Sequence, residues 1–206
     1  MTEQTVASYD RDAAAYAART AAVPATVRTA LAHLAERLGP GARVLEIGSG
    51  GGRDALLMEQ LGLVVRRTDV TPGFVALLRA HGHACDLLDP LVDDPASPDG
   101  PYDGVWANAS LLHVARDDLP TVLGRLAAVT RPGGLLQVSL KEGDGEGWST
   151  HGTISGPRHF TYWRAADLAD VVRAAGWVDV VARQGLGGDR GETWLEVSAV
   201  RDGVSP

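Results

Sequence analysis

The stretch Val44–Ala55, with the sequence VLEIGSGGGRDA, sets four glycines directly behind a short, mainly apolar run that contains Glu46. Glycines at this density let a backbone approach a ligand closely and adopt a positive φ. One interpretation is a dinucleotide-binding turn, G-x-G-x-x-G, that holds a pyrophosphate at a helix N-terminus. Gly48 and Gly50 fit that pattern, but Arg53 stands at its third glycine, where a large side chain is expected to obstruct the packing of the helix on the strand.

Glu46 favours a second interpretation of the same stretch. A carboxylate at the end of the strand repels a pyrophosphate and attracts an ammonium group. The pattern Glu46-x-Gly48-x-Gly50-x-Gly52 therefore indicates a cofactor that carries a cationic amino-acid moiety. A glycine-rich turn that binds no ligand is the structural alternative.

Two further acids follow strand-like segments. Asp69 stands 19 residues after Gly50, where a carboxylate accepts both hydroxyls of a ribose. Its alternative role is to interact with the dipole of the helix that begins after it. Asp86, in the run ACDLL, stands where an adenine amino group could be recognised, and the alternative is an exposed acid in an acidic loop.

Apolar periodicity and turn residues divide the chain into alternating strands and helices. Helices are predicted at 8–20, 24–41, 54–62, 71–82, 117–134 (which closes on a Gly-Gly turn) and 161–176, and strands at 42–47, 63–70, 83–88, 102–110, 135–143, 177–185 and 193–201. This alternation predicts an α/β fold with a doubly wound, mostly parallel sheet. The last two strands are joined only by the short turn LGGDRG, so they must pair antiparallel. In such sheets ligands bind at the carboxyl ends of the strands.

The composition narrows the classes of function. The chain has 206 residues, a formal net charge of −7 and a pI near 5.3, which argue against a large nucleic-acid footprint. A single cysteine, Cys85, excludes an intrachain disulfide and a cysteine-rich zinc site, and the two histidines of His81-x-His83 do not make a metal site. We therefore expect no metal and an inert, buried thiol. The absence of a secretory signal or a long apolar run predicts a cytoplasmic protein with no membrane partner.

Five stretches taken together resemble class I S-adenosylmethionine-dependent methyltransferases: VLEIGSGGGRDA, RTDVT, CDLL, YDGVWANASLLHV and LAAVTRPGGLLQVSLKEG. The resemblance covers about residues 40–200 and implies a single domain over 1–206, with a seven-stranded Rossmann-like sheet that ends in an antiparallel hairpin. It implies S-adenosyl-L-methionine as the cofactor. Residue by residue, it places Gly48, Ser49 and Gly50 against the methionine moiety, Glu46 near the amino group, Asp69 and Val70 at the ribose, Asp86 and Leu87 at the adenine, and Asn108 on the methionine side of the cleft.

The departures from the family pattern bear on the acceptor. The run WANAS is not the Asn-Pro-Pro-Tyr signature of members that methylate adenine or glutamine amino groups, so a small-molecule acceptor is favoured. Its reacting atom, O, N or S/Se, stays open, as does the oligomeric state. The alternatives are an NAD-linked oxidoreductase, which Glu46 and Arg53 disfavour, and a non-catalytic protein that binds S-adenosylmethionine.

Residues on the acceptor side come from two places. His113, in LLHV, follows a predicted strand at the cleft edge as a general base or as a packed histidine that orients the loop. The segment 143–163 begins with glycines and ends in aromatic residues, which suits a lid over the acceptor. In that hypothesis Arg158, His159 and Tyr162 face the acceptor. The alternative is a connector whose aromatic residues dock the next helix.

The N-terminal region 1–38 is expected to lie over the cleft. Tyr9 and Tyr16 are seven residues apart and share one helix face, and the resemblance implies a helix folded over the cofactor, with Tyr16 as a contact. Core packing is the alternative role for both. Lys141 and Glu142 end a predicted strand and are expected to face the same region.

Overall fold

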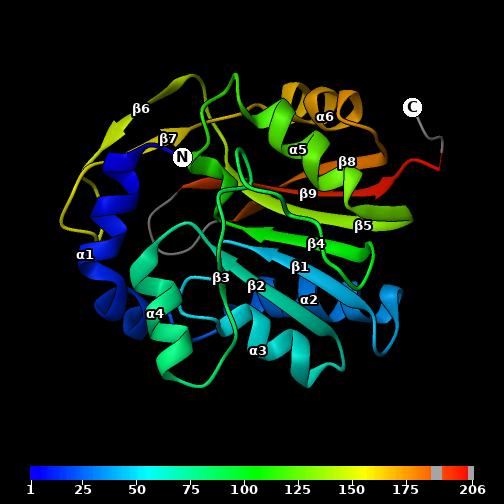
Figure 1. Cartoon of the computed structure of the whole chain (residues 1–206). Coiled ribbons are helices and arrows are strands. Elements are labelled where there is room, and N and C mark those ends of the chain that lie inside the picture. Colours follow the sequence, from blue (N-terminus) through cyan, green and yellow to red (C-terminus); the bar gives the residue numbers. More distant parts are fainter. Residues whose placement is uncertain (187–191, 204–206) are drawn as a thin grey trace.

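The computed structural model describes residues 1–186 and 192–203. Seven strands form one sheet in the order β3-β2-β1-β4-β5-β9-β8, with helices on both faces (Figure 1). The sheet strands are β1 (Arg43–Ile47), β2 (Val64–Asp69), β3 (Asp86–Leu87), β4 (Tyr102–Asn108), β5 (Thr130–Lys141), β8 (Trp177–Leu186) and β9 (Thr193–Arg201). The helices are α1 (Glu3–Arg19), α2 (Ala25–Leu38), α3 (Arg53–Gln60), α4 (Pro72–Ala80), α5 (Leu119–Ala128) and α6 (Ala165–Ala174), with a 3₁₀ turn η1 (Leu111–His113).

The strand directions confirm the predicted fold class. Strands β1 to β5 pair in parallel, whereas β9 is antiparallel to both β5 and β8. The chain runs outward from β1 to β3 and then returns to the other side of β1 as β4. This reversal opens a crevice at the carboxyl ends of β1 and β4, which is where such sheets bind ligands. Of the predicted turn LGGDRG, residues 187–191 lie outside the described residues.

Two apolar layers hold the sheet between its helices. In Figure 1, α2 and α3 lie below the sheet and α5 and α6 above it. Leu31 and Leu34 of α2 pack under the sheet with Met58 of α3, and Leu123 and Leu168 pack above it from α5 and α6; all five are at most 5% exposed. Burial of such side chains is the main force that fixes the helices to the sheet.

Two segments differ from the sequence-based prediction. The run RPGG was expected to form a turn that ends a helix; it instead interrupts β5 as a bulge between the pairs Tyr102–Thr130 and Gly104–Leu135, with Gly133 at a φ of 74°. A Cβ on Gly134 would stand 2.9 Å from the carbonyl oxygen of Asp103. That close approach leaves room only for glycine. The predicted lid segment 143–163 contains an antiparallel hairpin, β6 (Glu146–Ser149) and β7 (Arg158–Thr161), that forms a separate two-stranded sheet.

Helix α1 lies against α4 and the hairpin (Figure 1). Its Asp10 Oδ1 accepts a hydrogen bond of 2.6 Å from the amide of Gly73 at the start of α4. A Cβ on Gly51 would lie 2.9 Å from the Cβ of Ala17, so α1 also touches the glycine-rich turn directly. On its other side, Ser8 Oγ donates to the carbonyl of Pro157 at 2.8 Å. Polar contacts therefore tie α1 to two separate parts of the chain.

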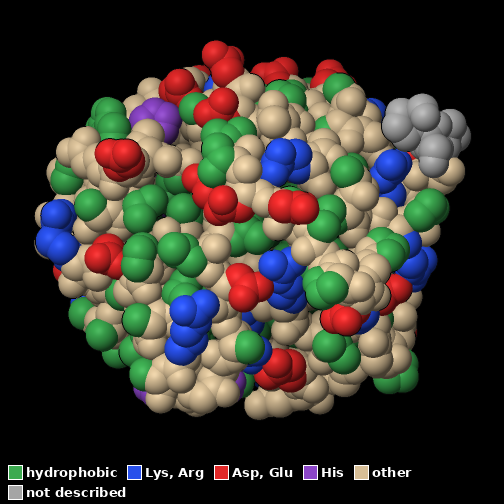
Figure 2. Space-filling view, viewed as in Figure 1, with side chains coloured by type: hydrophobic (Ala, Val, Ile, Leu, Met, Phe, Trp, Pro, Cys, Tyr) green, Lys and Arg blue, Asp and Glu red, His purple; other side chains and the backbone are tan. Residues whose placement is uncertain are grey.

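The surface carries both signs of charge. Figure 2 shows acidic and basic side chains interspersed over one face, with hydrophobic side chains scattered among them. Within the described ranges, no helix combines the length and apolar character that crossing a membrane requires.

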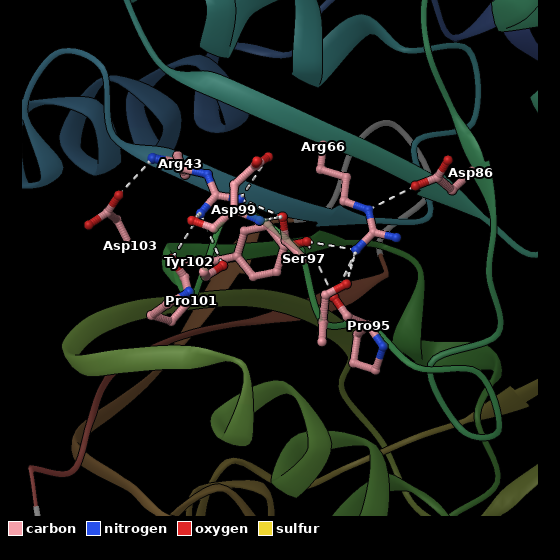
Figure 3. A network of polar contacts seen from close by, with 11 residues as sticks. Arg43, Arg66, Asp86, Pro95, Ser97, Asp99, Pro101, Tyr102 and Asp103 are labelled. Atoms are coloured by element: carbon pink, nitrogen blue, oxygen red, sulfur yellow. Dashed lines mark hydrogen bonds and ion pairs between the residues drawn. The ribbon is translucent and has the colours of Figure 1, made fainter.

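Two arginines fix the long connection between β3 and β4 to the sheet (Figure 3). Arg43 Nη1 donates to the carbonyls of Asp99 at 2.9 Å and Gly100 at 3.0 Å, and its Nη2 donates to Ser97 Oγ at 2.6 Å. One guanidinium thus satisfies carbonyls that otherwise have no strand or helix partner.

Arg66 on β2 repeats this arrangement further along the connection (Figure 3). Its Nη1 donates to the carbonyls of Pro95 at 2.9 Å and Ala96 at 2.8 Å and to Tyr102 Oη at 2.7 Å. Arg125 of α5 also donates to the carbonyls of Pro90 and Asp93, so the 89–101 connection is held by side chains of β1, β2 and α5.

We predict that Arg43→Met lowers the free energy of unfolding by about 1–3 kcal/mol, because it leaves several loop carbonyls without donors. Urea unfolding followed by circular dichroism measures the change. Arg173→Met, which removes an exposed pair with Asp170, is the matched control and is expected to change stability by less than about 0.5 kcal/mol. Equal effects of the two substitutions would contradict a special role for Arg43.

Candidate active site

A cavity of about 380 Å³ opens at the carboxyl ends of β1, β2 and β4. Its floor is the glycine-rich turn, and its wall includes one face of α1, the start of α4 and the residues after β4. The sequence-predicted residues that line it are Gly48, Ser49, Gly50, Asp69, Val70, Asn108, His113, Tyr9 and Tyr16. Helix α2 contributes only Arg28 to the lining among the described residues, whereas α1, Met1 before it and the connection after it (Thr20, Ala21 and Val23) supply the rest from region 1–38.

The backbone amides of the glycine-rich turn are already engaged. The amides of Gly48 and Ser49 each donate to the carbonyl of Thr68 at 2.9 Å, and the amide of Gly50 donates to Asp69 Oδ2 at 2.8 Å. A pyrophosphate site needs such amides free to point at the phosphate. The geometry therefore disfavours the dinucleotide interpretation.

The close fit of the turn explains its first glycine. Gly48 has a φ of 78°, and a Cβ there would collide with the side chain of Ser110 after β4. Ser110 Oγ is buried and has no hydrogen-bond partner within the described part of the chain, and Ser110 lines the cavity. An unpartnered buried hydroxyl costs free energy, so it marks a place where a polar ligand atom would be stabilised.

Asp69 joins the turn to α4. Its Oδ2 accepts from the Gly50 amide, and its Oδ1 accepts from the amide of Thr71 at 2.8 Å. Burial raises the pKa of Asp69 above its usual range, while these amide hydrogen bonds act in the opposite direction. The carboxylate is thus held in one orientation at the cavity floor.

Glu46 is a second buried acid beside the first. It is 2% exposed and accepts a hydrogen bond of 2.5 Å from Ser49 Oγ. Burial raises the pKa of Glu46 to about 8, and the negative charges of Asp54 and Asp69 act in the same direction. Such clustered acids strain the free protein electrostatically, and a cationic group in the cavity would relieve that strain.

Asp54 is a site residue that the sequence analysis missed. Its Oδ2 accepts from Trp106 Nε1 at 3.1 Å and from Asn108 Nδ2 at 2.8 Å. The Oδ1 of Asn108 in turn accepts from Ser139 Oγ at 2.6 Å. The available signal was the position of Asp54 in the first turn of a helix that follows a glycine-rich loop, where acids are favoured.

The expectation that Arg53 obstructs helix packing is wrong. Its guanidinium Nη1 donates to the carbonyl of Thr20 at 3.0 Å, so the side chain extends outward to the end of α1. The position that needs a glycine is Gly52, because a Cβ there would lie 2.5 Å from Leu78 Cδ2. Arg53 instead lines the cavity and links it to α1.

Four rings form the wall opposite the turn: Tyr9, Tyr16, Phe74 and His113. The ring centroids of Tyr9 lie 5.4 Å from Tyr16, 6.2 Å from Phe74 and 5.3 Å from His113. Tyr9 Oη is 2.9 Å from His113 Nε2, and His113 Nδ1 is 2.6 Å from the carbonyl oxygen of His159. The wall is thus apolar in its rings and polar at the Tyr9–His113 contact.

At one end of the cavity, the residues that line it come two positions later in the sequence than predicted. Asp86 and Leu87 lie outside the lining: Asp86 Oδ2 pairs with Arg66 Nε at 2.8 Å, and Leu87 is 56% exposed (Figure 3). Leu88 and Asp89 line the cavity in their place. The reason is that β3 has only two residues, so the chain reaches the rim of the sheet after the strand has ended.

Arg158, His159 and Tyr162 differ from their expected positions in a similar way. None of them is among the described residues that line the cavity. The Arg158 guanidinium lies 5.8 Å from the ring centroid of Tyr9 and 5.1 Å from that of Phe160 and donates to a backbone carbonyl. The ring of His159 packs against Trp148, with centroids 5.4 Å apart, and the ring of Tyr162 stacks on Phe160 at 6.3 Å. The pairing of β7 with β6 therefore leaves these two side chains with partners outside the cavity lining.

The remaining candidates lie outside the cavity. Lys141 pairs with a carboxylate next to β9, and Glu142 with a side-chain amide on β8. Cys85 is buried, and burial raises the pKa of its thiol to about 12, which fits an inert cysteine. Around His81 and His83, as elsewhere in the described ranges, no three potential ligands gather to hold a metal ion.

The sequence profile described as "Methyltransferase domain" matches residues 17–182, which is most of the chain. The chain belongs to this family. The solved 1,6-didemethyltoxoflavin-N1-methyltransferase of Burkholderia thailandensis, with bound 1,6-didemethyltoxoflavin and S-adenosylhomocysteine, is similar at 26% identity and a TM-score of 0.73. That similarity covers 96% of this chain and 88% of the other.

Two further proteins are similar over smaller parts or at lower identity. The ubiquinone biosynthesis O-methyltransferase of Xanthomonas axonopodis pv. citri (strain 306) is 35% identical over 115 residues, which are 53% of this chain and 47% of that protein. The match thus spans about half the length of the curated relatives. The magnesium protoporphyrin IX methyltransferase of Synechocystis PCC 6803, with bound S-adenosylmethionine, shares the fold at 19% identity and a TM-score of 0.65, over 86% of this chain and 78% of the other.

These comparisons confirm the predicted family, the Rossmann-like methyltransferase fold and S-adenosylmethionine as the cofactor. The NAD-linked alternative finds no support in them. The hydrogen bonds that the amides of Gly48, Ser49 and Gly50 already donate provide a physical reason, since these three amides do not point at a pyrophosphate.

The raised pKa of Glu46 gives a testable dependence of stability on pH. The folded protein holds a proton on this carboxyl between its ordinary pKa of 4.5 and about 8, and the unfolded chain does not. The free energy of unfolding therefore falls as the pH rises through that window, by at most about 1.4 kcal/mol per pH unit from this one group.

Glu46→Gln removes this contribution, so we predict that the ligand-free variant gains stability relative to the parent protein as the pH rises from 5 to 8. Urea unfolding at several pH values measures the difference. Glu36→Gln, an exposed carboxyl-to-amide change on α2, provides the control. Parallel pH profiles of the parent and Glu46→Gln would show that Glu46 ionises normally.

Proposed function

We propose that this protein transfers a methyl group from S-adenosylmethionine to a small organic acceptor in the cavity beneath α1. The observation that carries the proposal is the fixed orientation of the Asp69 carboxylate at the cavity floor, between the amides of Gly50 and Thr71. A buried acid that is oriented in advance suits the two hydroxyls of a ribose.

The residues that line the cavity, together with Glu46, which lies outside the lining and accepts a hydrogen bond from Ser49, fit the cofactor along its length. We assign Glu46, Gly48, Ser49, Gly50 and Asn108 to the amino-acid end, Asp69 and Val70 to the ribose, and Tyr16 to the side that α1 covers. The unpartnered Ser110 Oγ and the clustered acids support this direction, because they would gain partners from a polar, cationic ligand. At the adenine end the assignment passes from Asp86 and Leu87 to Leu88 and Asp89, which line the cavity.

When bound, S-adenosylmethionine supplies a methyl group on a positively charged sulfur, which departs as a neutral thioether with the electron pair of the broken bond. The chain itself contributes position and exclusion of water. Helix α1, with Tyr9 and Tyr16, separates the cavity from solvent, and the tight contact of Ala17 with Gly51 holds it there. Positioning and desolvation together account for a large part of the rate enhancement in such displacements.

The proposed acceptor is a small, flat organic molecule. The rings of Tyr9, Tyr16, Phe74 and His113 form a wall that would stack on or enclose an aromatic ring. The names of a toxoflavin N-methyltransferase and of ubiquinone biosynthesis O-methyltransferases support nitrogen or oxygen as the reacting atom. We also propose a cytoplasmic setting without nucleic-acid partners, which the single buried cysteine and the net charge of −7 support.

Methyl transfer is tested with radiolabelled S-adenosylmethionine and a panel of acceptors: 1,6-didemethyltoxoflavin, catechols, and aromatic thiols. Transfer of label to at least one member is the expected result. Calorimetric titration with S-adenosylhomocysteine and with NAD accompanies the assay, and binding of the first alone is expected. Binding without transfer to any member of the panel would overturn the proposed activity.

For the cofactor site, we predict that Asp69→Asn weakens binding of S-adenosylhomocysteine at least about 10-fold, because a hydrogen bond to a charged group is lost. Calorimetry measures the affinity, and the thermal midpoint is recorded to separate binding from folding. Asp144→Asn, an exposed acid paired with Arg164, is the matched control and is expected to bind normally. Unchanged affinity in a folded Asp69→Asn protein would exclude the ribose assignment.

A further inference from the structure

A chain of hydrogen bonds whose directions are fixed ends at the cavity. It begins at the backbone carbonyl oxygen of His159 on β7, which lies 2.6 Å from His113 Nδ1. A carbonyl oxygen can only accept a hydrogen bond. Nδ1 of His113 must therefore carry the hydrogen.

The other nitrogen of His113 then carries a lone pair. His113 is 3% exposed, and burial lowers the pKa of its imidazole to about 3, an effect to which the charges of Arg158, Lys141 and His159 contribute. The ring is therefore neutral near pH 7, with a hydrogen on Nδ1 alone. Nε2 lies 2.9 Å from Tyr9 Oη, so Tyr9 is the donor in that contact.

The hydrogen of Tyr9 Oη is therefore directed at His113, so only lone pairs of that oxygen remain for its other partners, which are Arg158 and any group bound in the cavity that Tyr9 lines. Burial raises the pKa of its hydroxyl to about 12, and the nearby Tyr16 hydroxyl and the charge of Asp69 act in the same direction. Arg158 opposes them through a hydrogen bond and its charge, and its Nε, also buried, has no partner among the described residues. A cation beside the oxygen stabilises negative charge that develops there during a proton transfer.

We propose that Tyr9 Oη receives the proton of an acceptor O–H or N–H group, while Tyr9 passes its own proton to His113 Nε2. The proposal rests on the proposed function and narrows its substrate class. The favoured acceptor enters the cavity as a neutral hydrogen-bond donor, such as a phenol or a ring N–H. A carbonyl oxygen facing Tyr9 would meet a second acceptor and be disfavoured.

The step balances in atoms and charge. The acceptor's X–H bond breaks, and its electron pair stays on X for the new bond to the methyl carbon. An O–H bond forms at Tyr9 as the old one breaks, and an N–H bond forms at His113 Nε2. The imidazolium then holds one positive charge as the sulfonium charge disappears, so the net charge of the cavity is unchanged. The loss of the sulfonium charge lowers the cost of protonating this buried histidine, which burial and the charges of Arg158 and Lys141 raise.

The direction of the hydrogen bonds is tested first, without methyl transfer. Nitrogen-15 NMR of the free protein is expected to show His113 as the neutral Nδ1–H tautomer at pH 6, with His113→Gln used to assign its signals. Tyr9→Phe should shift the Nε2 resonance and leave the tautomer in place. Tyr16→Phe removes the neighbouring hydroxyl on the same helix face and should move neither. An Nε2–H tautomer, or an imidazolium at pH 6, would overturn the proposal.

The catalytic role is tested with an O–H or N–H acceptor from the panel. Tyr9→Phe is expected to lower kcat at pH 7 by about 10²-fold with little change in KM, a loss typical of removing an acid–base group. Its rate should rise tenfold per pH unit until the acceptor ionises by itself, and it should be nearly normal with an acceptor that is already ionised, such as 4-nitrocatechol. His113→Gln, which can accept from Tyr9 but cannot take up a proton, should show the same pH dependence.

The outcomes separate this proposal from the proposed function. Full turnover of Tyr9→Phe with a neutral acceptor, while the parent protein also methylates it, overturns the proton path and leaves methyl transfer intact. A loss that is equal at every pH and for every acceptor would make Tyr9 structural. Failure of the parent protein itself to transfer label is a failure of the proposed function, and the NMR result still decides the direction of the hydrogen bonds.

Discussion

The Asp69 carboxylate is the contact on which the arrangement of the site depends. Its two oxygens bind the amides of Gly50 and Thr71, so a single side chain fixes the glycine-rich turn relative to α4. The glycine-rich turn also fixes the position of Gly51, which Ala17 of α1 contacts directly. The positions of the glycine-rich turn, α4 and α1 around the cavity therefore all depend on one carboxylate at the end of β2.

This arrangement has an electrostatic cost. Glu46, Asp54 and Asp69 are each at most 7% exposed, and burial raises the pKa values of Glu46 and Asp69. Several buried carboxylates close together destabilise a fold unless a group of opposite charge or a hydrogen-bond donor compensates their negative charge. Proteins tolerate such strain mainly at functional sites, where a ligand of opposite charge supplies the compensation.

The features that the sequence predicted are local ones. The alternation of strands and helices, the glycine-rich turn and the placing of Asp69 after β2 follow from apolar runs, turn residues and spacing, because each depends on neighbours in the chain. The Tyr9–His113 contact joins residues 104 positions apart, and the Asp54–Asn108 contact joins residues 54 apart. No local pattern encodes which side chain will meet which across such distances.

The predicted site residues that lie outside the cavity have a similar explanation, because their positions also depend on contacts between distant parts of the chain. Arg158 and His159 were expected at the cavity because their segment leaves a strand end, but the pairing of β7 with β6 decides which way the side chains point. Successive side chains of a strand point to opposite faces, so Arg158 and His159, as neighbours on β7, cannot both face the cavity. The two-residue strand β3 is a similar case, since its length places Asp89 and not Asp86 at the rim.

Helix α1 and the sheet contribute to the cavity in different ways. The sheet supplies turns whose glycines leave no room for a Cβ. It also supplies acids such as Asp69, whose carboxylate binds backbone amides and so requires its negative charge. The helix supplies side chains, and it is tied to the rest through polar contacts at Gly73 and Pro157 and not through the sheet core. Substitutions on α1 are therefore expected to be tolerated better than substitutions in the strand ends and turns that it covers. During evolution the identity of the acceptor is therefore expected to diverge through this one helix, while the donor half of the reaction is inherited intact.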